Sequence, residues 1–208
     1  MHPRSDASPP SDELVSLLGN PAGDSALAPV SVYLAEPPGG PELGAGSWES
    51  HHAISNLMFR YAECVDTADF DGLSELFANG GIRSTSAADS EEQMRGSAVG
   101  RFYAATNRVH GDGTLRTRHL STNVQIDIDE DGHLATARSY YVVFQATDKL
   151  PFQAIVGGRY EDRFVRESGA WRFEDRLVHV DQIGDVSDHL SFDLSKGGVR
   201  YDNPTSGK

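Results

Sequence analysis

A helical repeat of apolar residues opens the central part of the chain. Its members lie on one face of a helix: Ile54, Leu57, Met58, Tyr61, Ala62 and Val65. A second apolar group, Leu73, Leu76 and Phe77, predicts a short helix that stops at Asn79-Gly80-Gly81, since glycine favours a helix C-terminus. A third helix is predicted over about Ser97–Val109.

After the third helix, apolar and polar residues alternate with a period of two, which is typical of strands. Four segments rich in β-branched and aromatic residues follow one another: RTRHLSTNVQIDID, HLATARSYYVVFQA, FQAIVGGRYEDRFVR and AWRFEDRLVHVD. Short turns join them, so we expect antiparallel pairing. Gly157-Gly158 inside the third of these segments predicts a bulge, and Ile82–Ser86 predicts a further short strand.

Helices that are separated in sequence from a long antiparallel meander predict an α+β fold. We expect three helices packed on one face of a curved antiparallel sheet. A curved sheet closed by helices leaves a conical pocket, which is where a function is expected.

The ends of the chain have a different composition from its centre. Residues 1–46 are rich in Pro, Gly, Ser and Ala, and such segments bury too little apolar surface to offset their ordering entropy. We therefore expect a disordered N-terminal arm at 1–46, a folded domain at 47–192 and a flexible tail at 193–208.

Composition narrows the function classes. The formal net charge of −13 argues against nucleic-acid binding, which needs a positive footprint. No apolar run approaches the length of a membrane span, and the first residues do not read as a secretory signal. The single cysteine, Cys64, excludes an internal disulfide framework and suits a reducing cytoplasm. We expect Cys64 to be a core thiol.

Three aspartates lie between the first two helices. Asp69 or Asp71 stands at the right distance to cap the second helix. Asp66 ends the first helix, where a carboxylate is unfavourable against the helix dipole, and it flanks the apolar face. From this pattern alone, Asp66 is either a solvated helix end or a functional carboxylate.

The first long strand carries a histidine on its polar face. His119, Ser121 and Asn123 should share that face, while Leu120 and Val124 point away. A lone histidine is more often structural, but an imidazole exchanges a proton near neutral pH and a carboxylate partner makes it more basic. The pattern leaves both interpretations open.

Arg176 shares a strand face with Val178 and Val180, so it is either carried inward or exposed beside Glu174 or Glu161. A buried guanidinium needs an anion, which a protein carboxylate or a substrate could supply. The eight histidines form no known ligand motif, and no serine lies in a nucleophile-elbow motif, so neither a metal site nor a serine nucleophile is expected.

With these segments together, the chain resembles the SnoaL-like branch of the NTF2-like superfamily over about residues 47–192. Three stretches carry the resemblance: RYAECVDTADFDGLSELF, RHLSTNVQIDID and GGRYEDRFVRESGAWRFEDRLVHVD. The resemblance implies a cone of curved sheet over three helices, as the element order also predicts.

Within that superfamily, the chain is similar to the dehydratase and dehydrochlorinase branch, which includes scytalone dehydratase and bile-acid 7α-dehydratase. The resemblance implies that Asp66 orients His119 as a base. It also implies that Tyr61 or Arg176 stabilises negative charge or assists a leaving group. A further aspartate of the bile-acid enzyme is absent here, so its role is missing or filled by Ser139 or Tyr141.

The resemblance implies a lyase of the dehydratase kind, or an isomerase, that needs no cofactor. The expected substrate is small, hydrophobic or cyclic, of the polyketide or steroid kind, and the expected substrate-binding residues are Asn123, Tyr141 and Phe59. A homodimer or homotrimer is expected, with no nucleic-acid or membrane partner. Two alternatives remain open: a non-catalytic subunit like the small subunit of ring-hydroxylating dioxygenases, and a cyclase or epoxide hydrolase on the same cone.

Overall fold

The computed structural model describes residues 46–84 and 93–191. The arm expected at 1–46, apart from Gly46, and the tail expected at 193–208 lie outside the described residues, as does the end of the short strand predicted at Ile82–Ser86. In the part of the chain that is described, no helix is long and apolar enough to cross a membrane.

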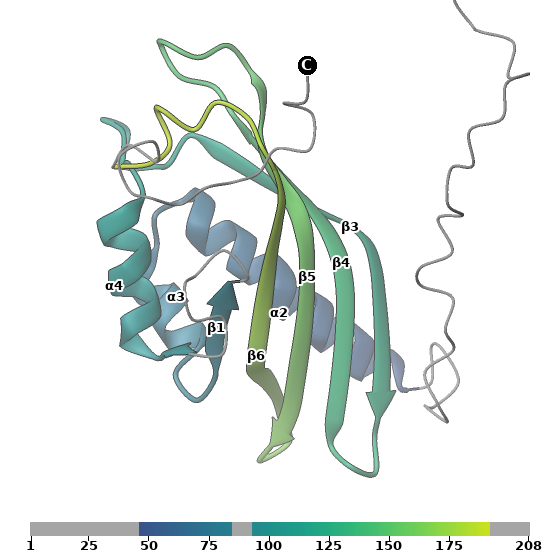
Figure 1. The fold of residues 1–208 in the computed structure, drawn as a ribbon. Coiled ribbons are helices and arrows are strands. Elements are labelled where there is room, and N and C mark those ends of the chain that lie inside the picture. Colours follow the sequence, from purple (N-terminus) through teal and green to yellow (C-terminus); the bar gives the residue numbers. More distant parts are fainter. Residues whose placement is uncertain (1–45, 85–92, 192–208) are drawn as a thin grey trace, which may run out of the picture. The chain divides into compact units, whose positions relative to one another are not determined.

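Three helices form where the apolar repeats predict them (Figure 1): α2 Trp48–Asp66, α3 Phe70–Leu76 and α4 Ser97–Thr106. Ser47 caps α2 by accepting a hydrogen bond from the backbone N–H of Ser50. Asp69 caps α3 by accepting one from Gly72 at 2.9 Å, as the sequence predicts. Both caps satisfy N–H groups that a helix start leaves unpaired.

The strands make one curved sheet. Their bounds are β1 Gly81–Ser84, β2 Met94–Arg95, β3 Thr117–Asp129, β4 Leu134–Gln145, β5 Gln153–Glu167 and β6 Ala170–Ile183. Their order across the sheet is β2-β1-β6-β5-β4-β3. The four long strands pair antiparallel as predicted, whereas β1 pairs parallel with β6, so the sheet is mixed.

Strand β2 has only two residues and carries no periodic signal in the sequence. One further element differs from the sequence prediction. Helix α4 ends at Thr106 instead of Val109, because Asn107 is extended and forms a β-bridge with Leu190 from the end of the described chain. A tertiary contact therefore ends this helix before its local pattern does.

Strand irregularities change which residues face the core. The predicted bulge is confirmed between Gly157 and Gly158, where the register between β5 and β6 shifts. A second shift lies between Thr122 and Gln125 of β3, and Asn123 there has a φ of 52°. After this irregularity the inward positions of β3 change from odd to even numbers.

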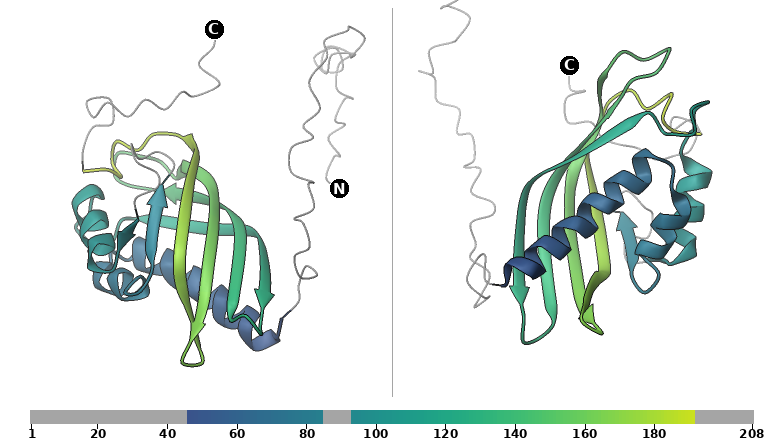
Figure 2. Two further views of the ribbon diagram at one scale, coloured as in Figure 1. Left: turned by 60° about the horizontal axis from the view of Figure 1, so that its bottom comes forward. Right: turned by 180° about the vertical axis from the view of Figure 1, so that it is seen from behind.

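Helix α2 crosses the sheet on one face, and α3 and α4 lie beside β1 (Figure 2). The core forms between α2 and the sheet from residues such as Ile54, Met58, Phe164 and Phe173, all fully buried. Cys64 is a buried free thiol, as expected.

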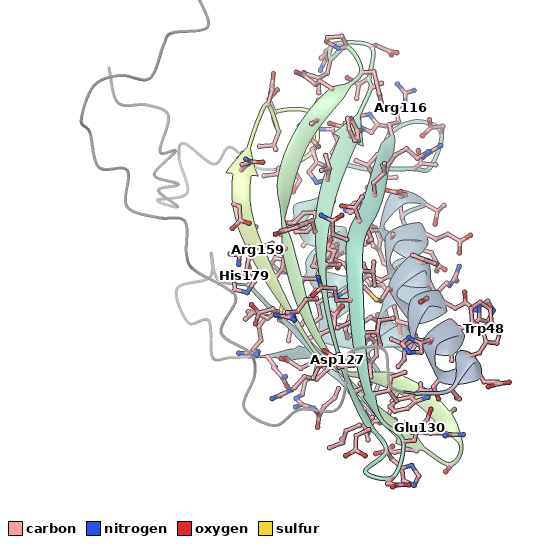
Figure 3. All side chains as sticks on the ribbon, turned by 90° about the vertical axis from the view of Figure 1, so that its right-hand side faces the viewer. Trp48, Arg116, Asp127, Glu130, Arg159 and His179 are labelled. Carbon is pink, nitrogen blue, oxygen red and sulfur yellow. The ribbon has the colours of Figure 1, made fainter. Side chains whose placement is uncertain are left out.

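Contacts at both ends fix α2 to β3. At the start of α2, the Ser47 N–H donates to Glu130, just beyond the end of β3 and far from Arg116 at its other end (Figure 3). At the end of α2, Asp66 is held by the first residues of β3, described below. These contacts place the Asp66 carboxylate beside the first residues of β3.

Candidate active site

Asp66 and His119 meet where α2 ends and β3 begins. The Asp66 Oδ1 atom lies 2.6 Å from the His119 Nδ1 atom. The same carboxylate accepts a hydrogen bond from the Thr117 hydroxyl at 2.6 Å and one from the His119 backbone N–H at 3.0 Å. Three donors from one strand therefore offset the unfavourable position of Asp66 at a helix C-terminus.

These donors keep Asp66 ionised. Burial raises the pKa of Asp66, but the hydrogen bonds and charge of His119, with the Thr117 hydroxyl, outweigh burial and hold the pKa below its ordinary value. The side chains of His119 and Asp66 are only 9% and 11% exposed, so water screens their interaction weakly.

The contact also sets the tautomer of His119. An ionised carboxylate can only accept, so the Nδ1 atom of His119 carries a proton that it donates to Asp66. In the neutral ring, the Nε2 atom then holds the lone pair and can take a proton from a neighbouring molecule. This is the arrangement of a general base with an orienting carboxylate.

A groove of about 380 Å³ opens beside this pair, between α2 and β3, which is an edge strand of the sheet. Its lining comes from Phe59, Ala62, Glu63, Asp66, Thr67, Arg118, His119 and Ser121. Phe59 is 53% exposed, so it offers an apolar ring to a molecule in the groove. The imidazole thus borders space that a small molecule could occupy.

The concave face of the sheet, where a conical pocket is expected, holds a cluster of polar and aromatic side chains. Tyr61 lies edge-on to Tyr103 and Tyr160, and Tyr141 stacks on Tyr160 with ring centroids 4.3 Å apart. The hydroxyls of Tyr61 and Tyr103 are 2.6 Å apart. Burial raises the pKa of Tyr61, so its phenol stays protonated.

Arg176 lies at the centre of this cluster and is fully buried. Its Nε and Nη2 atoms each donate to Asp162 of β5 at 2.7 Å, and its guanidinium stands 4.2 Å from the ring centres of both Tyr61 and Tyr160. The exposed alternative beside Glu174 or Glu161 is therefore wrong. Burial lowers the pKa of Arg176, but the charge of Asp162 outweighs it and raises the pKa, so the pair is ionic.

The predicted site residues therefore fall into two groups. Asp66, His119 and Phe59 meet at the groove, whereas Tyr61, Arg176 and Tyr141 belong to the buried cluster and are not among the groove's lining residues. Asn123 does not share the inward face of His119, because the strand irregularity at Thr122–Gln125 turns it outward, where it is exposed.

Two partners were missed by the sequence analysis although a signal was present. Thr117 lies two residues before His119, so strand alternation already places both on one face. Asp162 alternates with Tyr160 and Phe164, which are buried, and this marks it as an inward carboxylate. Among the described residues, no group of three or more His, Cys, Asp and Glu side chains is arranged to hold a metal ion.

Comparison with known families and structures agrees with this fold. The SnoaL-like domain family matches residues 47–177. No curated protein sequence matches the chain.

Three solved structures illustrate the similarity. A variant of Rv3472, a protein of unknown function from Mycobacterium tuberculosis, is 28% identical with a TM-score of 0.53, over 71% of this chain and 79% of that one. An NTF2-like protein with a cystatin-like fold from Novosphingobium aromaticivorans is 23% identical, with a TM-score of 0.53, over 64% of this chain and 82% of its own. A candidate scytalone dehydratase from the same organism is 22% identical, with a TM-score of 0.50, over 66% and 87%. These matches confirm the predicted NTF2-like α+β fold.

Proposed function

This chain belongs to the SnoaL-like family, and on that premise we propose that it is a small-molecule lyase of the dehydratase kind, or an isomerase, with His119 as its base. The observation that carries the proposal is the 2.6 Å contact between Asp66 and the Nδ1 atom of His119 beside an open groove. Buried carboxylate–imidazole pairs bordering a groove are suited to proton transfer near neutral pH.

In the proposed reaction, the Nε2 atom of His119 takes a proton from a carbon next to an electron-withdrawing group. The electrons of the broken C–H bond form a C=C bond as hydroxide or halide leaves the adjacent carbon. The imidazolium then gives its proton to the hydroxide, which departs as water, or to solvent where a halide has left. In the isomerisation no group leaves: the electrons of the C–H bond move into the electron-withdrawing group, and the imidazolium returns the proton to another carbon of the substrate. Every step draws on side chains and solvent alone.

Asp66 has two proposed roles in this cycle. It holds the ring with Nε2 toward the groove, and its negative charge stabilises the imidazolium that forms. Thr117 keeps the carboxylate in place. General acid–base catalysis of this kind contributes about 10²–10⁴-fold to a rate.

Arg176 is the proposed stabiliser of developing negative charge, with Tyr61 as its aromatic support. Two of its nitrogens are committed to Asp162, but the buried Nη1 atom has no hydrogen-bond partner among the described residues. An N–H held in a dry environment is a strong donor to an oxyanion, although the groove lining does not include Arg176. A small opening of the Tyr61 cluster is therefore part of the proposal.

The test is an elimination and isomerisation assay on a panel of cyclic hydroxy-ketones and halides. We expect turnover by the wild type, and a loss of about 10²–10⁴-fold in kcat for His119→Ala and Asp66→Asn. His52→Ala, at an exposed histidine on α2, is the matched control and should keep full activity. Wild-type rates in both site variants would reject the proposal.

The substrate-binding role of Phe59 is tested in the same assay. Phe59→Ala removes the exposed ring at the groove, so it should raise KM with a smaller change in kcat. If no compound is turned over and the protein instead forms a stable complex with a larger iron-containing subunit, the non-catalytic alternative holds.

A further inference from the structure

Arg118 lines the groove beside His119, and its charge has no counter-ion among the described residues. Most arginines in this part of the chain form an ion pair with a carboxylate, as Arg60 does with Glu63 at 2.9 Å. Arg118 forms none within residues 46–84 and 93–191, although the chain has a formal net charge of −13. A guanidinium that stays unpaired in so acidic a protein is available to an anion from outside.

Backbone geometry places the guanidinium of Arg118 at the outer edge of β3. Its Nη1 atom donates to the Thr117 carbonyl at 2.6 Å. In an antiparallel strand, the N–H and C=O of one residue point to the same edge, and residues two apart share that edge. The His119 N–H donates to Asp66 at the end of α2, so the Thr117 carbonyl and the guanidinium bound to it face the same side. The guanidinium therefore reaches the groove even though strand alternation points the Arg118 Cβ atom away from it.

This anchor leaves most of the guanidinium for a ligand. A guanidinium has five N–H donors in one plane, and the bond to Thr117 is the only side-chain hydrogen bond of Arg118 within the described chain. The Nε and Nη2 atoms form the side that binds a carboxylate through two parallel hydrogen bonds. Arg176 binds Asp162 in this way, with both distances at 2.7 Å. Arg118 presents the same pair of nitrogens without a protein carboxylate.

The acidic side chains of the groove are already paired. Glu63 accepts from Arg60 at 2.9 Å, and Asp66 is held by the first residues of β3. Arg118 is therefore the charge that a bound molecule would balance. Beside it, Phe59 offers an apolar ring that is 53% exposed. An apolar ring and an unpaired cation in one groove suit an apolar molecule that carries one negative charge.

We propose that the groove takes a small cyclic or aromatic carboxylate, bound through its carboxylate group by the Nε and Nη2 atoms of Arg118 and through its ring by Phe59. Two-point binding also orients the ring, as a positioned C–H group requires. Arg118 is then a specificity-determining residue, because an uncharged analogue leaves its guanidinium without this partner. The inference rests on the proposed function, in which the bound molecule presents a C–H group to His119.

Binding is tested first by isothermal titration calorimetry of the full chain at low salt. The probes are cyclohexanecarboxylate and cyclohexanecarboxamide, which have nearly the same shape and differ in charge. The wild type should bind the carboxylate about tenfold or more tightly than the amide, since a charge-assisted pair of hydrogen bonds is lost with the amide. A wild type that shows no such preference, or that binds neither probe, would overturn the proposal.

Two arginine variants then separate contact from general charge. Arg118→Met should remove the preference for the carboxylate. Arg138→Met is the matched control, because Arg138 is exposed on β4, lies outside the groove lining and bonds to Gln125 instead of a carboxylate. It changes the net charge equally and should keep the wild-type preference. Equal losses in the two variants would show that only the overall charge matters, which contradicts the proposal.

Arg118→Lys keeps the charge and removes the pair of parallel donors. The preference for the carboxylate should fall severalfold in this variant. A Lys variant that equals the wild type contradicts two-point binding. The same comparison decides the matter if Arg118→Met does not fold.

Kinetics separate this inference from the proposed function. The substrates are a cyclic hydroxy-ketone that carries a carboxylate and its methyl ester. Arg118→Met should lower kcat/KM for the acid by about tenfold or more, mainly through KM, and leave the ester unchanged. His119→Ala should lose turnover and still prefer the carboxylate probe.

The possible failures differ. If acid and ester are turned over equally well, with the same rates in Arg118→Met, the inference fails and the proposed function stands. If nothing is turned over while the preference for the carboxylate depends on Arg118, the proposed function fails and the anion site stands.

Discussion

The hydroxyl of Thr117 donates to the carboxylate of Asp66 across 2.6 Å, from the first residue of β3 to the last residue of α2. Thr117 is fully buried and Asp66 is 8% exposed. This contact fixes one oxygen of the carboxylate that also meets His119, so the position of the imidazole depends on a threonine for which the sequence analysis assigned no role.

Thr117→Val keeps the shape of the side chain and removes this donor. A hydrogen bond to a buried charged group contributes about 1.5–3 kcal/mol, so we expect a loss of that order in the free energy of unfolding, measured by urea denaturation. The pKa of Asp66 should rise at the same time. Thr122→Val, at an exposed position on the same strand, is the control and should change stability little. Equal effects of the two substitutions would contradict the role of Thr117.

Asp66 should also make stability depend on pH. Its pKa is lowered in the folded protein, so the stabilisation it gives is present above the unfolded value of about 4 and is lost as pH falls through the lower folded value. Urea midpoints of the wild type and Asp66→Asn, measured from pH 6 to pH 2, should therefore differ most at pH 6 and converge on acidification. A gap that stays constant across this range would show that the charge of Asp66 contributes nothing.

The buried pair of Arg176 and Asp162 gives a third prediction. Both side chains have no exposed surface, so removing one partner leaves an unpaired charge in the core. Arg176→Met should lower the free energy of unfolding by about 3–5 kcal/mol. The double variant Arg176→Met with Asp162→Leu should recover much of this loss, because neither charge is then buried alone. Chemical denaturation of the wild type, Arg176→Met, Asp162→Leu and the double variant forms the cycle, and a fully additive loss would argue against direct pairing.

Sequence patterns predict most of this fold because they act locally. The helical repeat from Ile54 to Val65 and the alternation in β3 to β6 each report which side of an element is buried. The cap at Asp69 and the bulge at Gly157-Gly158 follow from the chemistry of single residues. The end of α4 was not predictable in this way, since Asn107 leaves the helix to pair with Leu190, more than eighty positions away.

The site was predictable only in part, because some of its features depend on contacts between distant parts of the chain. Asp66 and His119 follow from an unfavourable helix end and a polar strand face, together with the family resemblance. Asn123 points outward because of a strand irregularity that no glycine in the sequence marks. Its left-handed φ of 52° is one that asparagine tolerates better than most residues.

The paired glycines of β5 offer a matched test of the bulge that shapes the sheet. A Cβ atom on Gly158 would overlap the backbone carbonyl oxygen of His179 on β6, and neither strand can move away without breaking the ladder. Gly158→Ala should therefore lower the free energy of unfolding by about 1–3 kcal/mol or more. At Gly157, the nearest atom to a new Cβ is the end of the Gln182 side chain at 3.1 Å, which can rotate away, so Gly157→Ala should be much milder. Thermal and urea denaturation of both variants measure the contrast. If the two substitutions cost the same, close approach of the strands at Gly158 is not what requires glycine there.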